Sequence, residues 1–331
     1  MLISKARLSK KIFSEDVERV PTRNGYGEGL VLAGEENENV VALCADLTES
    51  TRTLAFKEKF PERFIEIGVA EQLLATVASG MANYGKIPFI SSYAAFSPGR
   101  NWEQIRTTIA LNNVPVKIAG AHAGVSVGPD GATHQALEDL ATMRAMPNMI
   151  VIYPADAIEA KKATVEAAKN GKPTYLRFAR EKTPVVTTKA TPFKIGRAEI
   201  FWEEPDSQVA IIAAGPLVYE ALIAAESLSR NKIASIVINC HTVKPIDELV
   251  VIRAAKTAGA VVSVEEHQVT GGLGGAVAEV LAKNFPTPME FVGVQDRFGE
   301  SGEPEELLAK FSLKAKDIVE AAKKVVSRKD P

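Results

Sequence analysis

Short apolar runs and segments with helical spacing alternate along most of this sequence. Apolar runs without polar interruption predict strands that are buried on both faces of a sheet. In the first half the predicted strands are 40–45, 64–67, 87–90, 114–119, 149–153 and 174–178, and the helices between them include 101–113, 134–146 and 156–170. This order predicts a mostly parallel sheet with helices on both faces.

The alternation stops near Glu181 and begins again near Val209. The intervening segment is richer in Thr, Lys and Pro and has no helical period, which is typical of an interdomain connection. A second series follows, with predicted strands at 209–213, 234–239, 260–264 and 289–294, helices at 246–257 and 272–283, and two C-terminal helices near 304–311 and 314–328. We therefore predict an α/β fold of two domains, each a mostly parallel sheet flanked by helices, with boundaries at 1–185, a linker at 186–205, and 206–331.

Composition and charge narrow the class of protein. The 331 residues are 46% apolar and 24% charged, a balance that is ordinary for soluble globular proteins of one or two domains. A net charge of -2 without a long basic block leaves no footprint for nucleic-acid binding. The N-terminus is too broken by charge to be a signal peptide, and runs such as 209–217 are too short to span a membrane. We expect a cytoplasmic protein with Cys44 and Cys240 as buried free thiols.

Polar and aromatic residues follow directly after several predicted strands. In open α/β sheets, ligands bind beyond the carboxyl ends of the strands. The residues at these ends are Asp46, Ser50, Glu71, Tyr93, Phe96, His122 and Arg180. Acid, aromatic, imidazole and guanidinium groups gathered at one sheet edge indicate one site.

Glu71 lies between an apolar strand and a long helix of small residues. Burial favours the neutral form of a carboxyl group, so Glu71 is expected to hold or share a proton near neutral pH. The alternative is an ordinary helix-start acid that faces solvent, where the helix dipole favours negative charge.

The segment 120–135 is a Gly-rich loop that carries His122, Asp130 and His134. Glycines let the backbone approach a ligand, and His and Asp can hydrogen-bond hydroxyls or exchange protons with them. The alternatives are a simple Pro-Asp-Gly turn and a His134 that only begins a helix. Metal binding by the two histidines is less favoured because no third ligand lies nearby at suitable spacing.

Two further patterns each have two interpretations. Tyr93 and Phe96 flank two alanines, which either leaves a flat slot for a heteroaromatic ring or reflects core packing. The glycines of 271–275 open a helix after a strand, which predicts a tight turn at an interface, with a bound anion as the less favoured alternative.

The segments 67–72, 91–96 and 130–135 resemble, in order and spacing, the pyrimidine-binding domain of transketolases and of deoxyxylulose phosphate synthase. Residues after about Thr191 resemble the C-terminal domain of the same enzymes. The Gly-Asp-Gly motif with which that family holds Mg²⁺ and thiamine diphosphate does not occur in this sequence. The resemblance therefore implies the C-terminal half of a split transketolase, which needs a separate N-terminal subunit to bring both cofactors and which self-associates.

The resemblance also assigns roles to individual residues. Glu71 matches the glutamate that hydrogen-bonds N1′ of the aminopyrimidine and so takes part in catalysis. Of the other matched residues, Tyr93, Phe96 and Asp46 contact the cofactor, His122, Asp130 and His134 bind substrate hydroxyls, with both histidines also catalytic, and Arg23, Ser50 and Arg180 form a sugar-phosphate clamp. Gln72 and Arg100 lie where family members vary, which bears on substrate preference.

Three functions compete at this point. The first is transfer of a two-carbon ketol unit between sugar phosphates, by a transketolase or a relative such as a deoxyxylulose phosphate synthase-like enzyme. The second is that of the beta subunit of a 2-oxo-acid dehydrogenase, which has the same two-domain layout. The third is a non-catalytic scaffold subunit. The run 130–135 and the predicted phosphate clamp favour the first.

Overall fold

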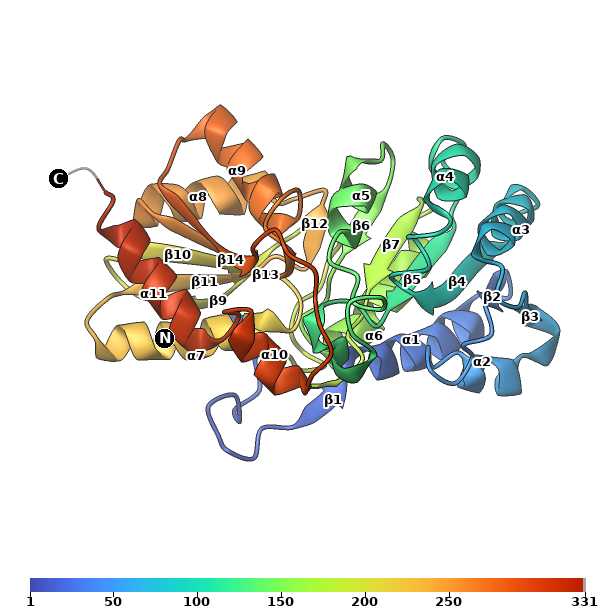
Figure 1. Ribbon diagram of the computed structural model, residues 1–331, viewed down its shortest axis with the longest axis horizontal. Helices are drawn as coiled ribbons and strands as arrows, with labels where there is room; N and C mark the ends of the chain where they lie inside the picture. The colour runs from blue at the N-terminus through green and yellow to red at the C-terminus, as the bar shows by residue number, and fades with distance from the viewer. Residues whose placement is uncertain (330–331) are drawn as a thin grey trace.

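The computed structural model describes residues 1–329, and in it two sheets lie side by side, each covered by helices (Figure 1). The first is a seven-stranded sheet in the order β12-β6-β7-β5-β4-β2-β3, parallel except for β12. Its strands are β2 (Val40–Cys44), β3 (Phe64–Glu66), β4 (Ile87–Tyr93), β5 (Lys117–Ala121), β6 (Ile150–Ile152), β7 (Thr174–Arg177) and β12 (Thr242–Lys244). A separate antiparallel pair joins β1 (Arg19–Pro21) to β8 (Lys182–Pro184).

The helices of this half include those that the periodicity predicts, together with α1 and α2, which were not predicted from the sequence. They are α1 (Thr22–Glu36), α2 (Leu54–Lys59), α3 (Glu71–Asn83), α4 (Trp102–Gln104), the π-helical η3 (Ile105–Ala110), α5 (Asp139–Ala145) and α6 (Ala157–Lys169), with short 3₁₀ turns η1 (Ser4–Ala6), η2 (Pro61–Arg63) and η4 (Val125–Asp130). Helices α1 and α6 pack closely because Gly25 has no side chain: a Cβ there would lie 1.9 Å from the carbonyl oxygen of Ala157.

The second sheet has five strands in the order β14-β13-β10-β11-β9, parallel except for β9. The strands are β9 (Glu199–Glu203), β10 (Val209–Ala213), β11 (Ser235–Asn239), β13 (Val261–Gln268) and β14 (Met289–Val294), and the helices are α7 (Leu217–Arg230), α8 (Glu248–Ala258), α9 (Leu273–Asn284), α10 (Pro304–Lys310) and α11 (Ala315–Val326). The predicted fold class, two mostly parallel sheets flanked by helices, is confirmed.

The two halves interlock more than the sequence pattern indicates. The segment 186–205, expected as a linker, contains β9, which pairs with β11. Strand β12, which comes from the second half of the chain, pairs with β6 at the edge of the first sheet. At the N-terminus, Ala6 and Ile12 are buried in the core of the second sheet, although the predicted boundary assigns them to the first domain. These pairings depend on contacts between distant parts of the chain, which local periodicity does not encode.

One predicted helix is shorter in the structure. The expected helix 134–146 is present only as α5, which begins at Asp139. Before it, the chain turns irregularly from Gly131, whose φ is +73°, and the side chain of Gln135 is buried among backbone carbonyls. His134 therefore lies in a loop and does not begin a helix.

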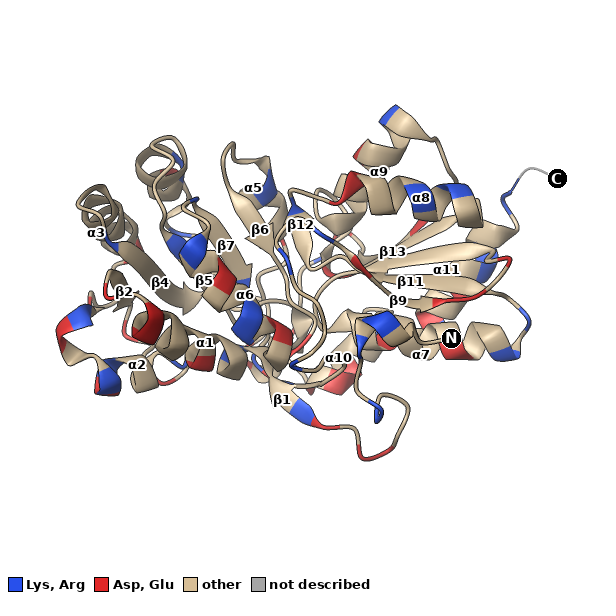
Figure 2. Cartoon of the chain, turned by 180° about the vertical axis from the view of Figure 1, so that it is seen from behind, with Lys and Arg blue, Asp and Glu red and all other residues tan. Residues whose placement is uncertain are grey.

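Both cysteines, Cys44 and Cys240, are free and buried, as predicted. No helix among residues 1–329 combines the length and apolar character that crossing a membrane requires. Basic and acidic residues are interspersed over both halves of the chain (Figure 2).

Candidate active site

Strands β7, β5, β4, β2 and β3 are successive neighbours in the first sheet, so their carboxyl ends form one edge. This edge carries the residues that the strand pattern singles out. Tyr93 is the last residue of β4, His122 follows β5, and Glu71 opens α3 just after β3. The topology thus brings to one place residues that are far apart in sequence.

Glu71 is buried, with 4% of its side chain exposed, so it is not a solvent-facing helix-start acid. Nη1 of Arg100 donates to both carboxylate oxygens, at 3.0 Å and 3.1 Å. The buried amide of Asn101 donates to the backbone carbonyl of Glu71 at 2.9 Å and fixes the start of the helix.

Four rings form a cluster that Arg100 connects to this carboxylate. The Tyr93 ring stacks on the imidazole of His122, with centroids 3.8 Å apart, and lies 5.8 Å from the ring of Phe96. His134 meets the edge of Phe96 at 5.2 Å. The guanidinium carbon of Arg100 lies 4.0 Å from the centroid of Phe96. Both aromatic side chains are partly exposed, so they do not serve only as core packing.

His122 is a neutral hydrogen-bonding residue in this structure. Arg23, which can only donate, lies with Nη1 3.2 Å from Nε2 of His122, so Nε2 accepts and Nδ1 carries the proton. Burial, together with the positive charges of Arg23 and Arg180, lowers the pKa of His122 to about 3. Its buried Nδ1 has no partner among the described residues. That N–H is available to a ligand.

Arg23 and Arg180, two of the residues predicted to form an anion clamp, both lie near His122. Nη1 of Arg23 also donates to the backbone carbonyl of Ser50 at 2.8 Å, which ties the loop after β2 to the site. Arg180 donates to the carbonyl of Val127 at 2.8 Å and lies 3.7 Å from the carboxylate of Asp130. Two arginines and a serine loop therefore face the same edge.

Asp46 is less closely connected to the others. It follows β2 in a left-handed conformation, with φ of +56°, and its backbone N–H donates to the carboxylate of Glu66 at 2.7 Å. Its side chain is exposed, and among the described contacts none joins it to another predicted site residue.

The loop that carries both histidines is held by residues that sequence reasoning missed. Nε2 of Gln135 donates to the carbonyl of Val125 at 3.0 Å and to that of Glu300 at 2.9 Å. Glu266, from β13 of the second sheet, accepts from the backbone N–H of Ser126. The motif 130–135 is a sequence feature from which Gln135 could have been found. Glu266 has no such feature beyond its position after an apolar strand.

The Gly-rich turn at 271–275 is a strand-to-helix connection at the interface of the two halves. Its N–H groups at Leu273 and Gly274 donate to the carboxylate of Glu265 at 2.7 Å and 2.8 Å, so the chain itself fills the place of an external anion. Arg144 of α5 donates to the carbonyl of Gly271 at 2.8 Å. Among residues 1–329, no group of three or more His, Cys, Asp or Glu is placed to hold a metal ion.

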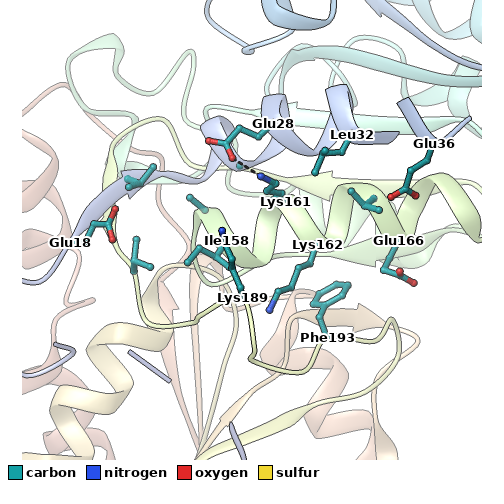
Figure 3. Close-up of a pocket in the computed structure, with 15 residues that line it drawn as sticks. Glu18, Glu28, Leu32, Glu36, Ile158, Lys161, Lys162, Glu166, Lys189 and Phe193 are labelled. Atoms are coloured by element: carbon teal, nitrogen blue, oxygen red, sulfur yellow. Dashed lines mark hydrogen bonds and ion pairs between the residues drawn. The ribbon is translucent and has the colours of Figure 1, made fainter. Parts of the chain in front are cut away.

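A cavity of about 510 Å³ lies elsewhere, between α1, α6 and the segment near Lys189 and Phe193 (Figure 3). Lys161 and Glu28 form an ion pair across it at 2.9 Å. It contains none of the predicted site residues. The sheet edge, not this cavity, is the candidate active site.

Comparison with known protein families identifies a domain in each half of the chain. Residues 18–185 match the family described as transketolase, pyrimidine binding domain, and residues 196–318 match transketolase, C-terminal domain. The chain belongs to the transketolase family. Within this family the matched regions are the two C-terminal domains of the enzyme.

Relatives of two lengths match this transketolase-family chain. A protein of Methanocaldococcus jannaschii described as a transketolase C-terminal section is 44% identical, over 91% of this chain and 96% of its own length. A 6-deoxy-6-sulfo-D-fructose transketolase subunit of Clostridium sp. strain MSTE9 is 39% identical, over 96% and 98%. The transketolase of Mus musculus is 35% identical over 94% of this chain but only 50% of its own length.

A solved structure supports the same assignment. A split gene transketolase, described as an inactive β4 tetramer, superposes with a TM-score of 0.88 at 44% identity, over 94% of this chain and 100% of that one. The chain thus corresponds to the C-terminal section of a split transketolase.

Proposed function

We propose that this chain is the C-terminal subunit of a thiamine-diphosphate-dependent transketolase, active only together with an N-terminal subunit that carries the diphosphate and Mg²⁺ site. The observation that carries the proposal is that Arg100 joins buried Glu71 to the ring of Phe96, which clusters with Tyr93 and His122, in a chain that matches half of a full-length transketolase. The reaction is transfer of a two-carbon ketol unit between sugar phosphates.

The residues present fit the aminopyrimidine end of thiamine diphosphate. Glu71 offers a buried carboxylate, and the Arg100 side chain that meets it is half exposed. The ring centroid of Phe96 lies 4.0 Å from the guanidinium carbon of the same arginine. When bound, the cofactor supplies a carbanion-stabilising thiazolium, which an amino acid cannot provide. Glu71 would hold or move a proton at the pyrimidine N1′, while Phe96 and Tyr93 would cover the ring.

The polar residues around these rings suit a phosphorylated sugar. The unpartnered Nδ1–H of His122 can donate to a substrate hydroxyl, and His134 lies within the same ring cluster. Because its pKa is low, His122 binds and orients substrate as a neutral group. Arg23 and Arg180 carry planar donor sets that match the oxygens of a phosphate. A sulfonate presents the same oxygens, and one relative is named for 6-deoxy-6-sulfo-D-fructose.

The test is reconstitution with the N-terminal subunit, thiamine diphosphate and Mg²⁺. We expect ketol transfer from xylulose 5-phosphate to ribose 5-phosphate, and no activity from this chain alone. 6-Deoxy-6-sulfo-D-fructose as alternative donor distinguishes a sulfo-sugar preference. Activity on pyruvate only would instead establish the beta subunit of a 2-oxo-acid dehydrogenase, and glyceraldehyde 3-phosphate with pyruvate tests a deoxyxylulose phosphate synthase-like reaction.

Replacement of Glu71 separates a catalytic from a scaffold subunit. Glu71→Ala should lower kcat of the assembled complex by about 10²–10⁴, the range for loss of a proton-transfer group. A scaffold role predicts full activity of the variant. Size-exclusion chromatography of the variant complex is the control, because assembly must be unchanged for the comparison to hold.

A further inference from the structure

The ion pair with Arg100 compensates the buried carboxylate of Glu71, and no other charged side chain among the described contacts bonds this carboxylate. A buried carboxylate without a partner is costly, and the Nη1 nitrogen of Arg100 bonds both of its oxygens. Glu71 is almost wholly buried, whereas 49% of the Arg100 side chain is exposed. The Glu71 side chain is therefore held in place, whereas the Arg100 side chain can move away from it toward solvent.

The same guanidinium also lies over an aromatic ring. Its carbon is 4.0 Å from the centroid of Phe96, a cation–π distance. A guanidinium is planar and its N–H donors lie in its plane. Arg100 thus presents a flat, stacked group with an N–H directed at Glu71. An aminopyrimidine held by the same two residues would likewise be a flat group stacked on Phe96, with a nitrogen that shares a proton with Glu71.

We propose that Arg100 stands in for the aminopyrimidine ring in the subunit without cofactor, and that it leaves Glu71 when thiamine diphosphate binds. The inference rests on the proposed function, since it takes Glu71 and Phe96 as the cofactor's contacts. Nη1 of Arg100 lies against both carboxylate oxygens, so a second donor that approaches from the same side has to displace it. Arg100 therefore competes with the cofactor, and Glu71 stays paired with the arginine until the complex is assembled.

The surrounding contacts allow this exchange without refolding. Asn101 donates to the Glu71 carbonyl at 2.9 Å and to Oγ of Ser97 at 3.1 Å, and it is fully buried. These bonds hold the start of α3 and the turn before Arg100 independently of the ion pair. Departure of the arginine then needs only a change of side-chain conformation.

The experiment compares Arg100→Met and Arg100→Lys in the free chain and in the full complex. In the free chain, Arg100→Met should lower the urea midpoint, because it leaves Glu71 unpaired. The same change in a Glu71→Gln background should have little further effect. Arg106→Met is the matched control: Arg106 is exposed and lies in η3, away from this ion pair.

In the full complex, thiamine diphosphate should bind roughly three- to tenfold more tightly to the Arg100→Met variant than to wild type, by calorimetry with Mg²⁺ present. Arg100→Lys, which keeps the charge but lacks the planar fork, should lie between the two and covers the case in which the methionine variant does not fold. Equal or weaker binding by both variants, with wild type binding normally, overturns the stand-in role alone. An unchanged urea midpoint for Arg100→Met also overturns it. A wild-type complex that binds no thiamine diphosphate overturns the proposed function and this inference together.

Discussion

Glu266 accepts a hydrogen bond at 2.6 Å from the backbone N–H of Ser126, across the boundary between the two sheets. Ser126 belongs to the loop that carries His122 and His134, while Glu266 lies in β13. The carboxylate also fills the space beside Gly124, where a Cβ would lie 2.3 Å from Oε1 of Glu266. The C-terminal half therefore shapes the loop that is predicted to bind substrate.

Removal of this contact should affect substrate binding more than cofactor binding. Glu266→Ala leaves a buried N–H unpaired, which costs about 1–3 kcal/mol of stability. We expect a raised KM for both sugar phosphates with an unchanged Kd for thiamine diphosphate, measured by steady-state kinetics and calorimetry. Glu266→Gln is the control, because its amide oxygen still accepts from Ser126. A KM that stays at the wild-type value in the alanine variant would show that the loop holds its shape without Glu266.

Arg180 should be required for the charged end of the substrate. Its charge is shared with Asp130 at 3.7 Å and Glu181 at 3.5 Å, and its remaining donors are available to an anion. Arg180→Ala should raise KM for a phosphorylated acceptor by on the order of tenfold or more, the value of a charge-assisted hydrogen bond. KM for an unphosphorylated ketose should change little. If both values rise equally, Arg180 does not recognise the phosphate.

Much of this site could be predicted from the sequence because strand ends can be read locally. Tyr93, His122 and Arg180 each follow an apolar run, and parallel order brings such ends together. Arg100 could not be placed, because its direction depends on the turn before it and not on any period. Glu266 could not be linked to Ser126, since the two lie far apart in sequence. The pairing of β12 with β6 could not be predicted either, because these strands also lie far apart in sequence.

His122 should remain neutral across the physiological pH range. Its pKa in the folded chain, about 3, lies below the ordinary value of 6.5, because of burial and nearby arginines. Below pH 6.5 the unfolded chain therefore binds a proton that the folded chain does not, so the contribution of this residue to stability falls as pH falls from 6.5 toward 3. NMR of the imidazole C2–H in the free chain should show no titration of His122 above about pH 5, with His122→Asn used for assignment. A midpoint near the ordinary value contradicts the buried, arginine-bonded imidazole.

Glu159 should produce a pH-dependent difference in stability of the opposite sign. It is fully buried, accepts from the backbone N–H of Ala155 and from Nδ2 of Asn239, each at 2.7 Å, and burial beside Asp156 raises its pKa to about 8. The folded chain therefore holds a proton that the unfolded chain releases above pH 4.5, so stability is lost as pH rises from 4.5 to 8, by up to about 1.4 kcal/mol per pH unit.

Glu159→Gln removes this dependence. Oδ1 of Asn239 has no partner among the described residues, so rotation of that amide lets it accept from the new amide group. The variant should match wild type near pH 5 and exceed it by a few kcal/mol near pH 8, as measured by urea unfolding at both pH values. Glu166→Gln on the same helix is the control, because Glu166 lies on the cavity-facing side of α6 and is exposed. The prediction is contradicted if the difference in unfolding free energy between the variant and wild type stays constant from pH 5 to pH 8. In that case Glu159 is ionised in the folded chain, and the Asn239 amide donates the hydrogen bond that compensates its charge.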